Sequence, residues 1–425
     1  MPPADRSRRD VLKAAVAAGS TAALAACADL APDDDPPRGD DKPARQHAWH
    51  DHVRTDEYGN AELPRHQTLL YLSLDRDGPP TDADREIVER ALAVLDDAYE
   101  WSHDGLLFSV GYSPAYFERF DAALPDSVDL PEPEPLSPFE DPGFDTQDAL
   151  VHLASDRADV VLAAEHALRG RTDDANGVEA VPLTDALSVE SRRTGFVGAG
   201  MPADRQNAAG IPDSEPVPEE SPLFMGFTAG FRENQASEDR VTIQSGPFAG
   251  GTTKVVSNLR QRLDDWYGEQ DYEERVMELF SPGHAADDLV EGVGNNLGTN
   301  SRIDDYVDDI EAHAREYGRV GHAQKAARAN RDSDGDVRVL RRHFESTDDV
   351  GSERAVASLH FPSLQREISA FEEVRRAMNG TDLTEVTPAV RQRVNNGILE
   401  YVFVRRRGYF LVPPRELRAL PAPGP

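Results

Sequence analysis

The chain has 425 residues, enough for two domains with their own cores, and carries 78 acidic against 45 basic side chains. A net charge of -33 without a basic stripe excludes nucleic-acid binding, because phosphate contacts require clustered lysine and arginine. Lysine is scarce and the acidic residues are dispersed, which is typical of a protein that folds in molar salt, where the Debye length is roughly 3 Å. An ordinary acidic exported protein is the alternative.

The first 27 residues read as an export signal. Ser7-Arg8-Arg9-Asp10-Val11-Leu12-Lys13 is typical of a twin-arginine signal, and the weakly apolar run at 14–26 is too short to span a membrane. The run ends at Cys27, the only cysteine, in a Leu-Ala-Ala-Cys box that resembles a lipoprotein cleavage site. We expect twin-arginine export, lipidation of Cys27 and anchoring to the outer face of the cell membrane by lipid alone. An N-terminal amphipathic helix belonging to the fold is the alternative.

Residues 28–64 are predicted to be an acidic, proline-rich linker and a lead-in segment, with a flexible spacer from 28 to about 45. The lead-in holds His47, His50 and His52, with Asp51 between the last two. Such a cluster is able to coordinate a metal ion. The alternative is a solvated segment, or one packed by Trp49, since no second ligand cluster is near in the sequence.

Residues 65–223 are predicted to form an N-terminal ferredoxin-like domain. Apolar patterns predict strands at 65–75, 105–112 and 149–155. Helices are predicted at 82–99 and 157–168, and a short one after Ser113. This order is typical of a split βαβ layer. Residues 171–223 have little periodicity and are predicted to be a long connection.

Residues 224–425 are predicted to form a second ferredoxin-like domain. A glycine-rich turn at 226–234 precedes a strand through Val255 and a helix that includes Leu259 and Leu263. His322 opens a short helix, an acidic turn follows at 330–336, and a strand is expected at 337–344. The acidic turn does not fit a calcium loop, because its glycine is misplaced and no glutamate closes it. A strand and helix from 357 to 378 and a closing hairpin at 397–414 complete the prediction.

Several of these segments, taken in order, resemble the dye-decolorizing peroxidases. The resemblance covers residues 66–414, with 171–223 as the main gap. In the first half it rests on Gly111, Tyr112, Pro114, Phe117, Pro138, Phe139 and Asp156. In the second half it rests on Gly226, Phe227 and Gly230, on Leu340-Arg341-Arg342-His343-Phe344, on Gln365-Arg366-Glu367, and on Gly408-Tyr409-Phe410-Leu411-Val412-Pro413.

The resemblance implies an α+β fold of two ferredoxin-like domains packed as a dimeric α+β barrel, with a haem b pocket mainly in the C-terminal domain. It implies that His322 is the axial iron ligand, that Arg341 is the catalytic distal arginine and that Glu400 is the acid bonded to the proximal histidine. A surface charge on an edge strand is the alternative for Glu400. Cofactor contacts are also expected from Gly226, Phe227, Gly230 and Arg232.

The chain departs from the family pattern at two positions. Ala229 stands where the family signature has an aspartate above the haem, and alanine cannot move the proton of hydrogen peroxide. Glu233, Asp239 or a water molecule would have to substitute. His343 stands where several members have asparagine, and it is able to hydrogen-bond peroxide or act as the missing base.

The first functional hypothesis is a haem-dependent peroxidase at the outer cell surface, which reduces hydrogen peroxide and oxidises a reductant in one-electron steps. Ala229 supports a second hypothesis, a haem-binding or iron-handling surface lipoprotein with weak or no peroxidase activity. A third is a haem-free surface lipoprotein that uses the fold as a binding scaffold. An absorption band of bound haem separates the third hypothesis from the others, and turnover separates the first two.

Overall fold

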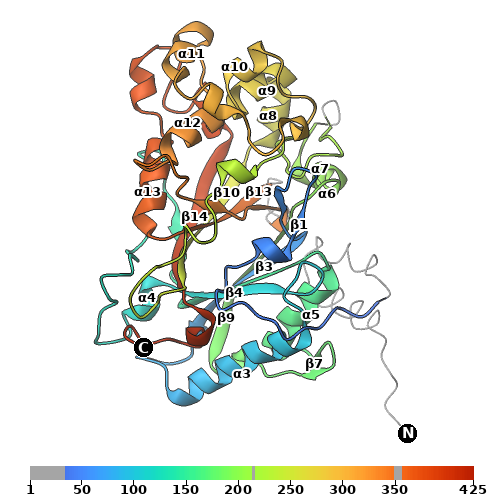
Figure 1. Cartoon of the computed structure of the whole chain (residues 1–425), viewed down its shortest axis with the longest axis vertical. Coiled ribbons are helices and arrows are strands. Elements are labelled where there is room, and N and C mark those ends of the chain that lie inside the picture. Colours follow the sequence, from blue (N-terminus) through green and yellow to red (C-terminus); the bar gives the residue numbers. More distant parts are fainter. Residues whose placement is uncertain (1–33, 213–215, 349–356) are drawn as a thin grey trace.

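The computed structural model describes residues 34–212, 216–348 and 357–425, and Figure 1 shows their arrangement. The expected signal and the lipidated Cys27 lie outside the described residues. Within the described ranges, no helix is both long and apolar enough to cross a membrane. The chain forms two halves, each built on a four-stranded antiparallel sheet, with helices at opposite ends of the view in Figure 1.

The N-terminal half has the ferredoxin-like strand order, because its first strand lies between its fourth and third. The sheet runs β9-β3-β6-β4, with all neighbours antiparallel. Two helices cover one face of this sheet and bury the apolar stripe that the sequence predicts. The elements are β3 His66–Leu74, α3 Asp82–Ala98, β4 Leu107–Tyr112, β6 Ala149–Ser155, α5 Ala158–Leu168 and β9 Leu187–Phe196.

Strand β9 corrects the prediction of a long connection at 171–223. It is ten residues long and pairs with β3 along its whole length. Its apolar alternation is hidden by arginines that are paired: Arg193 binds the carboxylate of Asp145, and Arg192 binds Glu165. A strand whose charged side chains are neutralised inside the fold therefore lacks the apolar alternation that predicts a strand, and its sequence resembles that of a loop.

The C-terminal half repeats the same strand order, β14-β10-β13-β12. Two local predictions are wrong here. Residues 397–414 form a short 3-10 turn and one long strand rather than a hairpin, and Leu259 belongs to a strand rather than a helix. The strands are β10 Thr252–Gln261, β11 Leu340–Arg341, β12 Phe344–Ser346, β13 Ser358–Gln365 and β14 Val402–Val412.

The two sheets close on each other into a barrel. Strand β12 pairs with β9 through Glu345 and Phe196, and β14 pairs with β4 through Leu411 and Tyr112. Apolar side chains from both halves fill the interior: Leu69, Tyr71, Leu150, Val256, Phe344 and Phe410. The predicted dimeric α+β barrel is confirmed.

Most helices of the C-terminal half gather at one end of the molecule, opposite α3 and α5 (Figure 1). Five of them, α8 to α12, connect β10 to β11, and α13 follows β13. Their bounds are α8 Leu263–Glu269, α9 Tyr272–Leu279, α10 Pro282–Ala286, α11 Ile310–Tyr317, α12 His322–Ala329 and α13 Ile368–Ala377. The remaining short elements are β1 Arg54–Thr55, β2 Ala61–Glu62, β5 Gly143–Phe144, β7 Asp174–Ala175, β8 Val178–Glu179, α4 Pro114–Phe117, α6 Met201–Asp204 and α7 Gln206–Ala209.

Residues 34–45 lie along the N-terminal half, so the prediction of a flexible spacer is wrong for this part of the chain. The carbonyl of Pro37 accepts a hydrogen bond from Glu100 N, and Pro43 accepts one from Arg415. Gln46 then enters the seam between β4 and β14. Its amide exchanges hydrogen bonds with the main chain of Val110 and donates to the carbonyl of Pro413.

Candidate functional site

A largely apolar cavity of about 310 Å³ lies in the C-terminal half, and every residue that lines it falls between Leu223 and Arg407. One face of the sheet forms a wall, with Leu259 of β10 and Phe361 of β13. Helices α12 and α13 and the loop at 223–234 line much of the rest. Apolar walls with few polar groups are typical of cofactor and ligand sites.

His322 reaches this cavity because two glycines allow α12 to pack closely. Gly321 caps the helix, and a Cβ there would collide with the carbonyl of Phe280. Gly397 has a φ of +59°, and a Cβ there would lie 2.9 Å from the backbone nitrogen of His322. The start of α12 is therefore fixed between two segments of backbone.

The imidazole of His322 is in the form that binds metal. Burial, with smaller contributions from Lys325 and Arg341, lowers the pKa of His322 to about 3, so the ring is neutral at physiological pH. Its ring nitrogens have no hydrogen-bond partner among the described residues, and the side chain lines the cavity. A neutral, unpartnered imidazole offers a free lone pair.

Arg341 places a positive charge in the same cavity. Gln235 Oε1 accepts hydrogen bonds from its main-chain N–H at 2.9 Å and from its Nε at 3.3 Å. No carboxylate in the described part of the chain lies within ion-pair distance, and burial alone lowers the pKa of Arg341 to about 10. The guanidinium therefore remains charged, and an anionic ligand would supply the ion-pair partner that it lacks among the described residues.

His343 lies on the same face of the strand as Arg341. Arg341 faces Ser363 and Phe344 faces His360, so the register is continuous even though Pro362 lacks the N–H that would join β11 to β12. The imidazole of His343 stacks on Phe361, with ring centroids 6.1 Å apart. Burial, and then Arg341, lowers the pKa of His343 to about 3, which makes it a weak base.

The N-terminal half supports the cavity from outside. Glu140, in the loop after Phe139, forms ion pairs with Arg375 of α13 and with Arg407 of β14. Both arginines line the cavity. No local pattern in the sequence marks the two arginines as site residues, because their partner is more than two hundred residues away.

The signature loop is divided between the cavity and the adjoining core. Phe227, Ala229 and Gly230 line the cavity, whereas Gly226 does not. Gly226 has a φ of +88°, and a Cβ there would lie 2.8 Å from the hydroxyl of Tyr267. At the expected position of the aspartate, Ala229 presents only a methyl group.

Two residues expected to contact the cofactor do not line the cavity. Arg232 is exposed and lies outside the cavity, because its loop is tied to Asn60, whose side-chain oxygen accepts from Arg232 N. Glu400 also lies outside the cavity, and no hydrogen bond within the described part of the chain joins it to His322. The 3-10 turn directs Ile398 and Leu399 into the cavity instead.

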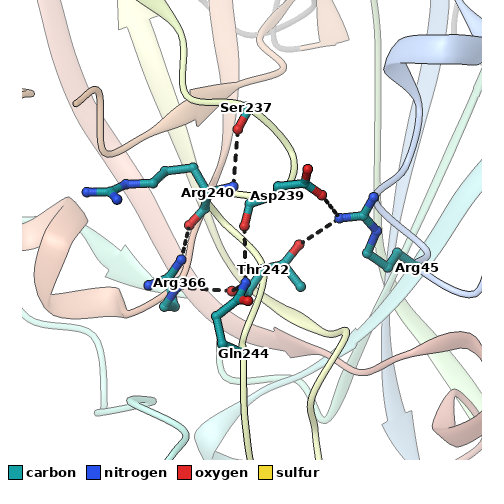
Figure 2. Close-up of a pocket in the computed structure, with 7 residues that line it drawn as sticks. All are labelled: Arg45, Ser237, Asp239, Arg240, Thr242, Gln244 and Arg366. Atoms are coloured by element: carbon teal, nitrogen blue, oxygen red, sulfur yellow. Dashed lines mark hydrogen bonds and ion pairs between the residues drawn. The ribbon is translucent and has the colours of Figure 1, made fainter.

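The acids considered as substitutes for the missing aspartate also lie elsewhere. Glu233 is exposed and accepts a hydrogen bond from Thr299. Asp239 is exposed and paired with Arg45. Asp239 and Arg45 both line a separate surface hollow of about 590 Å³. Figure 2 shows the Asp239 carboxylate directed at the Arg45 guanidinium. The arginines of that hollow already have partners: Arg240 binds Asp332, and Arg366 donates to the carbonyls of Thr242 and Arg240.

The histidine-rich lead-in is packed into the fold. His47 is buried with its Nε2 2.8 Å from the hydroxyl of Thr242, and Trp49 lies against Arg342 and His152. Among the described residues, the one group with metal-holding spacing is His103, Asp104 and Asp156, which includes none of the three lead-in histidines. Its two carboxylates already form ion pairs with Arg54.

Comparisons with solved structures show a shared fold. A DypB variant from Rhodococcus jostii in complex with heme aligns with a TM-score of 0.55 and 15% identity, over 88% of this chain and 97% of that one. A dye-decolorizing protein from V. cholerae gives 0.52 and 14%, over 85% and 97%. The encapsulated DyP-type peroxidase from Mycobacterium smegmatis gives 0.53 and 15%, over 86% and 97%.

Comparison with curated proteins gives no match. The model of a family of unknown function, DUF7405, matches residues 64–414, and the chain belongs to that family.

Proposed function

We propose that the chain is a haem-dependent peroxidase that reduces hydrogen peroxide and oxidises a reductant in one-electron steps. One observation carries the proposal: His322 and Arg341, which have no hydrogen-bonding partner for the imidazole and no ion-pair partner for the guanidinium among the described residues, line one apolar cavity in a fold shared with dye-decolorizing peroxidases.

The residues of the cavity fit haem b. His322 would hold the iron, since a neutral imidazole is a common ligand of haem iron. The apolar wall suits the macrocycle, and Arg341 suits an anionic group of the cofactor or the substrate. Phe227 and Gly230 line the cavity beside them. Because no carboxylate within the described ranges binds His322, that ligand would be a weaker electron donor than an imidazole bonded to an acid.

When bound, haem would supply the redox chemistry: two electrons for cleavage of the peroxide O–O bond, to be replaced one at a time by a reductant. In this chain, Arg341 would stabilise the negative charge that develops on the departing oxygen. His343 would orient peroxide by a hydrogen bond, since its lowered pKa makes it a poor proton acceptor at neutral pH.

Turnover tests the proposal. The chain, purified in molar salt and loaded with haem, should oxidise a dye when hydrogen peroxide is added. Arg341→Leu should lower kcat/KM by roughly 10²-fold, which is typical for the loss of one transition-state charge contact. Arg240→Leu, in the surface hollow, is the matched control and should leave turnover unchanged. A haem-loaded chain without turnover would overturn the proposal.

Ala229 favours a second candidate, a haem-binding or haem-handling protein with little peroxidase activity. Its methyl group lines the cavity where an acid would transfer the peroxide proton. Ala229→Asp separates the two candidates. A large gain of turnover from a near-zero starting level supports haem handling, whereas efficient wild-type turnover supports the peroxidase.

We also propose a location: export of the folded protein by the twin-arginine route and anchoring at the outer face of the membrane through lipid on Cys27. The Arg-Arg pair followed by a Leu-Ala-Ala-Cys box supports this address. Replacement of Cys27 by Ser should move the protein from the membrane fraction to the medium. Retention of Cys27→Ser in the membrane fraction would contradict the lipid anchor.

A further inference from the structure

The cavity wall also contains a buried carboxyl group, that of Glu345 on β12. It belongs to the same strand face as Arg341 and His343, because the register through this segment is continuous. Side chains two residues apart on a strand lie about 7 Å apart, so the three form a row along one wall.

Only one oxygen of this carboxyl group is engaged. Glu345 Oε1 accepts hydrogen bonds from the main-chain N–H of Phe224 at 3.0 Å and from Gln261 Nε2 at 3.4 Å. Glu345 Oε2 is buried and has no partner among the described residues. Burying an ionised carboxylate oxygen without a hydrogen-bond partner in an apolar wall costs free energy. A protonated oxygen that faces a ligand avoids most of this cost.

Its surroundings favour the protonated form. Burial raises the pKa of Glu345 to about 8, and the two hydrogen bonds to Oε1 only partly oppose that effect. Because both donors approach Oε1, the proton belongs on Oε2, the oxygen that is free to meet a ligand. At neutral pH the group is therefore a neutral acid that is able to give up a proton.

No other carboxyl group can perform this task in the part of the chain that the structure describes. Among the described residues that line the cavity, Glu345 is the one acid. Ala229 has no proton to transfer, and Glu233 and Asp239 are exposed outside the cavity. The row on the strand therefore contains the positive charge of Arg341, the weakly basic imidazole of His343 and one proton donor, Glu345.

We propose that Glu345 is the proton-transfer residue of this cavity, in place of the acid that the signature loop lacks. The inference rests on the proposed function. The carboxyl group donates its proton to the peroxide oxygen that leaves as water. The resulting carboxylate then accepts the proton of the other peroxide oxygen. Over a full cycle, one hydrogen peroxide, two electrons from the reductant and two protons give two waters, and Glu345 returns to its starting state.

The test compares Glu345→Gln and Glu345→Asp in the haem-loaded chain. Glu278→Gln is the matched control, because Glu278 is also a buried carboxyl group whose pKa burial raises, to about 7, but it lies on α9 outside the cavity. Two rates are measured: the change in haem absorption on mixing with hydrogen peroxide, and the association of cyanide. Hydrogen cyanide must lose its proton to bind iron, so its rate reports proton transfer independently of turnover.

Glu345→Gln should bind haem like the wild type. It should react with peroxide roughly 10²–10⁴-fold more slowly, which is the range of general acid–base catalysis. It should also bind cyanide more slowly. Glu345→Asp should recover part of both rates, and Glu278→Gln should match the wild type. Wild-type rates in haem-loaded Glu345→Gln would overturn this inference alone. Failure of the wild type to bind haem would overturn the proposed function and this inference with it.

Discussion

The side-chain nitrogen of Lys325 lies 2.7 Å from both the main-chain and the side-chain oxygen of Asn396. Lys325 is one turn after His322 on α12, and Asn396 immediately precedes Gly397, against which the backbone of His322 packs. This contact therefore fixes the helix that carries the proposed iron ligand.

Replacing Lys325 by Met should destabilise the protein and weaken haem binding. Lys325 also donates to the carbonyl of Met378 at 3.1 Å, so the variant leaves buried acceptors unpaired, at a cost of about 1–3 kcal/mol. The free energy of unfolding, from urea titration in molar salt, checks the first effect. The more exposed Lys42→Met is the control and should cost less. Equal stability of Lys325→Met and the wild type would contradict this role.

Gly321→Ala should displace the start of α12. The added methyl group would collide with the carbonyl of Phe280, and backbone cannot move aside as a flexible side chain would. We expect a loss of more than about 2 kcal/mol in the free energy of unfolding and weaker haem binding. Gly268→Ala is the control: its methyl group would meet nothing within 4 Å, and it should be neutral or stabilising by up to about 1 kcal/mol.

Stability should depend steeply on salt. With a net charge of -33, self-repulsion opposes folding at low ionic strength and is screened in molar salt. The urea midpoint of unfolding should rise strongly between 0.1 and about 2 M sodium chloride, the range over which the Debye length falls from about 10 Å to a few ångström. Sucrose at equal osmolality controls for solvent exclusion. A midpoint independent of salt would indicate an ordinary acidic protein.

Acid should destabilise the barrel interior through His360. Burial, and then Arg193, lowers the pKa of His360 to about 3, from about 6.5 in the unfolded chain. Between these values the unfolded state binds the extra proton, so the free energy of unfolding increases with pH, and this contribution is lost as the pH falls from 6.5 toward 3. His360→Gln should lower the slope by up to about 1.4 kcal/mol per pH unit. Parallel curves for variant and wild type would contradict this prediction.

The sequence predicts the fold where apolar periodicity is undisturbed, as in β3 and α3. It fails where charged side chains on strands are neutralised by distant partners. Arg193 hides β9 in this way, and Arg406 and Arg407 make the middle of β14 resemble a turn, although they bind Asp145 and Glu140. These partners lie far away in the sequence, so no local pattern identifies them.

The residues of the candidate site also include some that were predicted from the sequence and one that was not. His322, Arg341 and His343 were predicted from the resemblance, and the structure brings them to one cavity. Glu345 was missed, although it is two residues beyond His343 and alternation along a strand would have placed it on the same face. Glu400 was expected beside His322, but it lies at the end of a 3-10 turn whose preceding residues face the cavity instead.

Haem titration of the cofactor-free chain in molar salt is the sharpest test of haem binding through His322. We expect the wild type to saturate at one haem per chain with an intense Soret band, and His322→Ala to lose or shift that band until imidazole is added. His166→Ala, on α5 of the other half, should match the wild type. No Soret band in the wild type, or an identical band in His322→Ala without imidazole, would contradict the account.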